Sequence, residues 1–155
     1  MNDNKCLIEP ARDDDIPALV ELLAELFSIE QDFHPDPARQ SRGLVALLSS
    51  PNARIMVARS PQGKPIAMCS AQLVFSTAEG APSAWVEDMV VHPEWRGRRV
   101  GRAVLKAVLD WASAQGATRA QLLADLDNFQ ALAYYQQLGW SETRLVARRL
   151  SLLPN

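Results

Sequence analysis

The sequence predicts one mixed α/β domain, spanning residues 1–155, in which helices cover a twisted sheet. The 155 residues are 48% hydrophobic and 22% charged, a composition typical of one globular domain with its own core. Segments with helical spacing of apolar residues alternate with segments rich in β-branched residues. Their order is strand, two helices, three strands, helix, strand, helix and strand, without an internal repeat or linker.

The first half of the chain carries a strand, two helices and a hairpin. Pro10 ends the opening strand, and an aspartate among residues 13–15 caps a helix whose apolar residues recur at helical spacing. The turn signal Pro61-Gln62-Gly63-Lys64 separates two strands of an antiparallel hairpin. The expected elements are a strand at 5–9, helices at 16–27 and 38–48, and strands at 54–60 and 65–78.

The second half continues with two strands, each followed by a helix, and then a closing strand. Gly116 and Gly139 stand where the two helices should end, and Asn128 is placed to cap the second helix. The expected elements are a strand at 84–91, a helix at 100–115, a strand at 118–126, a helix at 129–138 and a strand at 140–153.

Composition argues against several classes of protein. No apolar run approaches the ~20 residues of a membrane span, and the N-terminus lacks the order of a secretion signal, so a cytoplasmic protein without a membrane partner is expected. Cys6 and Cys69 lie far apart without ligand-spaced neighbours, which predicts free thiols. His34 and His92 have no ligand-spaced partners, so no metal site is expected. The net charge of −2 argues against a nucleic-acid partner.

A loop rich in arginine and glycine, residues 96–102, lies between an expected strand and an expected helix. Four arginines surround two glycines there, and the loop lacks the Gly-Lys-Ser/Thr ending of a Walker A motif. Backbone N–H groups and the positive end of a helix dipole converge at such a position, and arginine adds bidentate phosphate donors. The pattern predicts a site for a phosphorylated ligand; a solvated basic loop and a nonspecific nucleic-acid contact are the alternatives.

Two segments resemble motifs of the GNAT family of N-acetyltransferases. Residues 87–105 (EDMVVHPEWRGRRVGRAVL) resemble its signature, a Gln or Arg, two residues, Gly, one residue, then Gly or Ala. Arg96 matches the start and Gly101 the end, whereas Arg99 stands where the first glycine is usual. Residues 128–140 resemble a second motif, Asn-x-x-Ala-x-x-Phe-Tyr-x-x-Leu-Gly-Phe. Within the family, the chain looks most similar to the spermidine/spermine and thialysine acetyltransferase branch.

The resemblance implies an acyl-CoA N-acyltransferase fold with a mostly antiparallel central sheet flanked by helices. It implies acetyl-CoA as co-substrate, with the 89–91 strand edge along the pantetheine arm and an amide of that edge on the oxyanion. The loop would hold the pyrophosphate, and Asn128 would both cap its helix and touch coenzyme A. The residues expected to bind the co-substrate are Met89, Val90, Val91, Arg96, Gly97, Arg98, Arg99, Val100, Gly101, Arg102 and Asn128.

Acetyl transfer to an amine requires a group that removes the amine proton and a group that protonates the leaving thiolate. The resemblance assigns the acid role to Tyr135, whose alternative is a core aromatic position. Glu87 is the candidate base, acting directly or through water, and its alternative is a surface or ion-paired strand residue. Strand alternation places Asp88 on the opposite face unless a bulge intervenes.

An acidic and aromatic stretch between the first two helices is the candidate acceptor site. Glu30, Asp32, Phe33 and His34 would attract a cationic amine; solvated or capping acids are the alternative. The predicted function is acetylation of the primary amine of a small molecule that is polyamine-, diamine- or amino-acid-like. Acetylation of a protein N-terminus or lysine and a catalytically idle acyl-CoA sensor are the alternatives. The exposed edge of the closing strand predicts a homodimer.

Overall fold

The computed structural model describes residues 5–30 and 32–154, and the chain forms two compact units, Met1–Leu123 and Ala124–Asn155. The first unit is built on a five-stranded sheet with the order β1-β2-β3-β4-β5. Strands β1 to β4 pair antiparallel, and β5 pairs parallel to β4, so the sheet is mixed and mostly antiparallel, as predicted. The strands are β1 (Leu7–Pro10), β2 (Ala53–Arg59), β3 (Pro65–Ser76), β4 (Ala81–Val91) and β5 (Arg119–Leu122).

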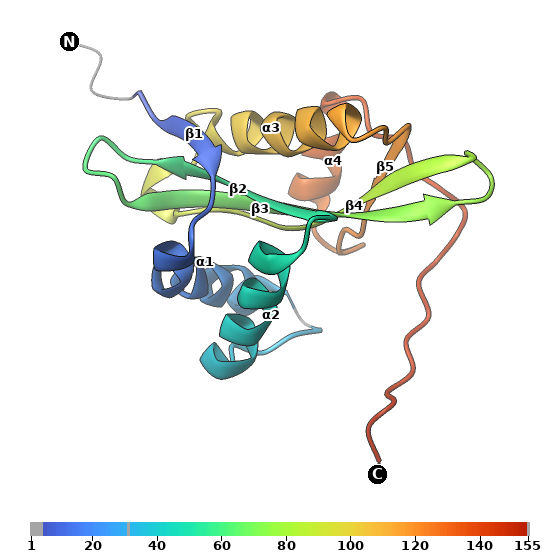
Figure 1. Ribbon diagram of the computed structural model, residues 1–155, viewed down its shortest axis with the longest axis horizontal. Coiled ribbons are helices and arrows are strands. Elements are labelled where there is room, and N and C mark those ends of the chain that lie inside the picture. The colour runs from blue at the N-terminus through green and yellow to red at the C-terminus, as the bar shows by residue number, and fades with distance from the viewer. Residues whose placement is uncertain (1–4, 31, 155) are drawn as a thin grey trace. The chain divides into compact units, whose positions relative to one another are not determined.

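Helices cover both faces of this sheet (Figure 1). One face carries α1 and α2, which pack leucines onto Ile55, Val57, Met68 and Val90 of the strands. The other face carries α3, whose buried residues include Val104 and Val108. The helices of this unit are α1 (Ile16–Ile29), α2 (Pro37–Ser49) and α3 (Val100–Ala114), with short 3-10 turns at Asp13–Asp15 and Pro93–Trp95. The predicted α/β class is therefore confirmed.

A buried ion-pair network holds the start of α1 to the sheet. Arg59 donates two hydrogen bonds to the Asp15 carboxylate, at 2.7 and 2.6 Å, and also contacts Glu9. The hydrogen bonds from Arg59 are the main reason that the pKa of Asp15 lies below its ordinary value. Asp15 also accepts the Arg12 N–H at 2.8 Å. An aspartate of this turn was expected to cap the helix; Asp15 is the N-cap residue of α1, but its side chain makes no capping hydrogen bond to the helix and joins α1 to β2 instead.

The second unit contains α4 (Phe129–Gln137), where two predictions from sequence are confirmed. Asn128 caps the helix by accepting the Ala131 N–H at 3.1 Å, and Gly139 has a left-handed φ of 93° just after its end. The closing strand expected at 140–153 is wrong, because residues 141–153 form neither helix nor strand. The segment contains residues that favour a strand, but among the described residues no strand pairs with it. Leu145 and Leu152 are accordingly 84% and 91% exposed. The homodimer inferred from that strand stays a prediction.

Three further predictions concern the end of the sheet, the cysteines and membrane-spanning helices. The last strand of the sheet, expected at 118–126, ends at Leu122, four residues early. Cys6 and Cys69 are free thiols, as predicted. Within residues 5–30 and 32–154, no helix has both the length and the apolar composition needed to cross a membrane.

Candidate active site

Strand β4 carries a β-bulge at the two acidic residues singled out in the sequence. The register between β3 and β4 shifts between Met68 and Ser70, so Asp88 and Met89 together stand opposite a single residue of β3. Asp88 has a left-handed backbone with φ of 55°, which non-glycine residues adopt rarely. The sequence predicted that Asp88 faces away from Glu87 unless a bulge interrupts the strand, and the structure contains such a bulge.

The bulge puts Glu87 and Asp88 on one face of the sheet. Trp85 donates its indole N–H to the Glu87 carboxylate at 2.5 Å, so these two side chains share a face. Val90 packs in the core beneath α1 and α2. The charges of Glu87 and of Glu30, which follows α1, act on the Asp88 carboxyl, so Asp88 lies near both. The pairing of Ser70 with Glu87 and of Met68 with Val90 shows that both pairs lie on the helix α1 and α2 side.

This face is acidic beside the C-terminus of α1. Burial, and after it the nearby charges of Glu87 and Glu30, together raise the pKa of Asp88 to about 7. Glu30 follows the last residue of α1, where its N–H bonds the Leu26 carbonyl oxygen at 3.1 Å. The structure thus brings one member of the predicted acceptor stretch together with the predicted base and its neighbour.

The other members of the acceptor stretch are exposed. Phe33 packs against Phe27 of α1, with ring centroids 5.5 Å apart, and is 44% exposed. Asp32 and His34 are exposed as well. Their contact with a substrate stays a prediction.

The edge of β4 beyond the bulge is free of a strand partner on the β5 side. Strand β5 pairs with Ser83–Val86 only, and in the described part of the chain no strand pairs with residues 87–91 on that side. This edge therefore has no neighbouring strand in the described residues, the arrangement that accepts an extended ligand as an added strand, although the Val91 carbonyl oxygen already accepts a hydrogen bond from Arg96. The predicted role of Met89, Val90 and Val91 requires such an edge.

The arginine loop joins this edge to the N-terminus of α3. Gly97 and Arg99 both have left-handed backbones, with φ of 75° and 61°. The conformation at Arg99 explains why a glycine is usual at this place in the motif, since glycine adopts it without the ~1 kcal/mol penalty of other residues. Gly101 allows α3 to approach β4, because a Cβ atom there would lie 3.1 Å from Cγ2 of Val91. The loop keeps the expected turn despite Arg99.

The arginines of the loop differ in what they contact. Arg96 donates its Nε–H to the Val91 carbonyl oxygen at 3.1 Å, and Arg98 lies over the Trp95 ring at 5.0 Å. Both contacts stiffen the loop. Arg99 and Arg102 are exposed, and the first-turn N–H groups of α3, which have no acceptor inside the helix, point the same way as its dipole. This end of α3 can therefore hold a phosphate.

Tyr135 and Asn128 belong to the second unit. Tyr135 is half-buried, and its ring packs edge-on against Tyr134 and Trp140, with centroids 5.5 and 5.9 Å apart. The assigned contacts of Tyr135 and Asn128 with the co-substrate stay predictions.

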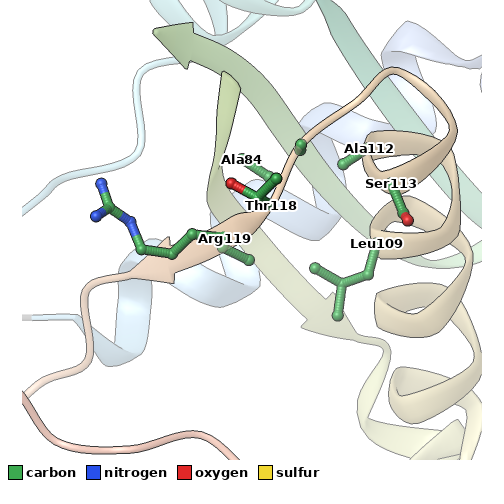
Figure 2. Close-up of a pocket in the computed structure, with 8 residues that line it drawn as sticks. Ala84, Leu109, Ala112, Ser113, Thr118 and Arg119 are labelled. Atoms are coloured by element: carbon green, nitrogen blue, oxygen red, sulfur yellow. The ribbon is translucent and has the colours of Figure 1, made fainter. Parts of the chain in front are cut away.

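Two hollows open on the first unit, on opposite faces of the sheet. The smaller, about 180 Å³, lies between the C-terminal half of α3 and the start of β5, lined by Leu109, Ser113 and Thr118, while the Arg119 side chain extends away from it (Figure 2). The larger, about 340 Å³, is lined by residues of β3, β4 and β5, including Trp85. The sequence analysis did not identify Trp85 as a site residue. Its position two residues before Glu87 on a strand would have placed the two side chains on one face.

Metal-ligating side chains do not gather in groups of three or more within residues 5–30 and 32–154. The free β4 edge and the loop at the start of α3 offer instead the two features that a long phosphorylated ligand lying along a strand would need. The chain belongs to the acetyltransferase (GNAT) family, whose model matches residues 16–140. The family uses acetyl-CoA as co-substrate, and the chain is an N-acetyltransferase.

Relatives and solved structures agree with this assignment. The chain is 27% identical over 125 residues to an aminoglycoside N(6′)-acetyltransferase type 1 from Stenotrophomonas maltophilia, covering 78% of this chain and 82% of the relative. Its fold matches a putative acetyltransferase from Agrobacterium tumefaciens with a TM-score of 0.79 and 24% identity, over 94% and 99% of the two chains. An aminoglycoside acetyltransferase from an uncultured soil metagenomic sample, solved with sisomicin, has a TM-score of 0.79 and 22% identity, over 99% and 100%.

Proposed function

We propose that this chain transfers the acetyl group of acetyl-CoA directly to the primary amine of a small molecule, with residues 1–155 acting as one domain. The observation that carries the proposal is the layout of β4: carboxylates at its bulge, a free edge after them, and a phosphate-holding loop at its end. From Glu87 to Val91 the strand spans about 13 Å, at about 3.3 Å per residue. An acceptor and an extended acyl donor can therefore meet along one strand.

The donor half of the site fits coenzyme A. The edge at Met89, Val90 and Val91 offers backbone partners to the amides of a pantetheine arm, and one of its N–H groups serves the oxyanion. The first-turn amides of α3 and the exposed Arg99 and Arg102 offer donors to the pyrophosphate. Acetyl-CoA supplies the activated thioester.

The acceptor half favours a cation. The charges of Glu30 and Glu87 both act on the Asp88 carboxyl, so three acids lie near one another and attract an ammonium group. The relative from Stenotrophomonas maltophilia is named for the acetylation of aminoglycosides, which supports a small-molecule amine as the acceptor class. A peptide amine is the competing acceptor.

Glu87 and Tyr135 move the protons in the proposed reaction. Glu87 takes the proton of the ammonium group, directly or through water, and the free amine attacks the thioester carbon. The C–N bond forms, the C–S bond breaks, and Tyr135 gives its phenol proton to the thiolate sulfur. Asp88 is the second candidate for the base, because its pKa of about 7 suits proton transfer at neutral pH. The pH profiles of Glu87→Gln and Asp88→Asn decide between them.

The test is a screen of polyamines, amino acids, aminoglycosides and peptides for thiol release from acetyl-CoA. Release with a small amine, lost in Glu87→Gln together with Asp88→Asn, supports the proposal. A melting temperature that acetyl-CoA does not raise would contradict donor binding. Release only with peptides would contradict the acceptor class.

A further inference from the structure

The larger hollow, here called the Trp85 groove, shares a face with the carboxylates. It is lined by Val74 and Ser76 of β3, Ser83 and Trp85 of β4, and Arg119 and Gln121 of β5, with a volume of about 340 Å³. Ser83 pairs with Val74 and with Arg119, and Trp85 with Gln121, so these side chains project from one side of the sheet. Glu87 projects from the same side, because Trp85 donates a hydrogen bond to it.

The groove therefore continues directly from the acidic site. Trp85 is two residues from Glu87, a step of about 7 Å along a strand. The indole lies between the two: its N–H is engaged by the carboxylate, while its ring lines the groove. A ligand whose ammonium group rests on the carboxylates can place the rest of its body in this groove.

The groove lining contains no acidic residue. Its one cation, among the residues lining it, is Arg119, which pairs with Glu79 at 3.4 Å and also donates to Ser76. Its floor is apolar and aromatic at Val74, 54% exposed, and at Trp85, with polar atoms at Ser83 and Gln121. Such a lining suits an uncharged ring with an apolar face. A second ammonium group would lie beside Arg119 and find its neighbouring acid already paired.

Building on the proposed function, we propose that the Trp85 groove binds the uncharged ring body of the acceptor, so that the preferred substrates are primary amines carrying a ring and no second positive charge. This assignment separates the chain from polyamine acetylation, which the sequence motifs alone suggested. Val74 and Trp85 then determine specificity, and the carboxylates determine only that the acceptor is an amine.

The first experiment compares two amines, 4-phenylbutylamine and spermidine, by thiol release from acetyl-CoA. Wild type is expected to show the higher kcat/KM with 4-phenylbutylamine. Val74→Ser lowers that value about fivefold, because apolar contact is lost, and leaves spermidine unchanged. The matched control is Val45→Ser on α2, the same substitution at 51% exposure outside the groove, which leaves both amines unchanged. A preference for spermidine, or equal effects of the two variants, overturns the inference.

The second experiment needs no turnover. The indole N–H signals of the four tryptophans are followed by NMR as 4-phenylbutylamine is added, and the Trp85 signal is identified by its loss in Trp85→Phe. A shift of the Trp85 signal that Val74→Ser weakens supports the groove; an unmoved signal overturns it. If no amine releases thiol but the signal shifts, the proposed function fails and the groove stands, so the two failures are distinguishable.

Discussion

Replacing Asp88 with asparagine should change how the stability of this protein depends on pH. Burial, together with Glu87 and Glu30, raises the pKa of the Asp88 carboxyl from 3.8 to about 7 in the folded state. The folded protein then keeps a proton that the unfolded chain releases, so stability falls as pH rises from about 4 to about 7. Asparagine cannot ionise, and it tolerates the left-handed conformation that Asp88 adopts.

The magnitude follows from the two pKa values. Between pH 5 and pH 8 the ionisation of Asp88 should remove about 2.5 kcal/mol of unfolding free energy, at about 1.4 kcal/mol per pKa unit. Urea denaturation of wild type and Asp88→Asn at both pH values measures it, and the variant should gain about 2.5 kcal/mol relative to wild type on going to pH 8. Glu25→Gln, an exposed acid of α1, is the control. A difference between wild type and Asp88→Asn that is equal at the two pH values would refute the reasoning.

Two further substitutions test the donor side. Tyr135→Phe removes the phenol proton, so turnover should fall about 100-fold while the melting-temperature shift caused by acetyl-CoA stays as in wild type; unchanged turnover would remove Tyr135 from the acid role. Arg99→Gly relieves the left-handed backbone at φ of 61°, so the unfolding free energy measured in urea should rise by up to ~1 kcal/mol. A loss of stability would show that contacts of the Arg99 side chain outweigh the backbone strain.

Periodicity and turn residues were sufficient to predict most of the fold. The spacing of leucines in α1 and the turn before Lys64 predicted a helix and a hairpin that the structure contains, because those signals are local. The segment at 140–153 has the residues of a strand, but a strand forms only where another strand pairs with it, and no local pattern encodes that partner. The pairing of strands that are distant in the sequence could therefore not be predicted from local patterns.

The candidate site divides in the same way. The motif identified the loop, and the capping role of Asn128 followed from residue type alone. The bulge at Asp88 was not predictable, since it inserts one residue into a regular alternation that the sequence shows as unbroken. The face of Asp88 therefore depended on a bulge that only the register between β3 and β4 reveals, and the groove beside Trp85 likewise follows from strand register.

The left-handed non-glycine backbones of the described residues lie at the β4 bulge and at the start of α3. Asp88 and Arg99 are the non-glycine residues with left-handed backbones in residues 5–30 and 32–154, and each is expected to cost on the order of 1 kcal/mol. Asp88 lies where the acceptor is proposed to bind, and Arg99 where the pyrophosphate is. Val90, between them, is anchored in the core under α1 and α2. Packing of Val90 beside the bulge therefore offsets part of the strain at Asp88.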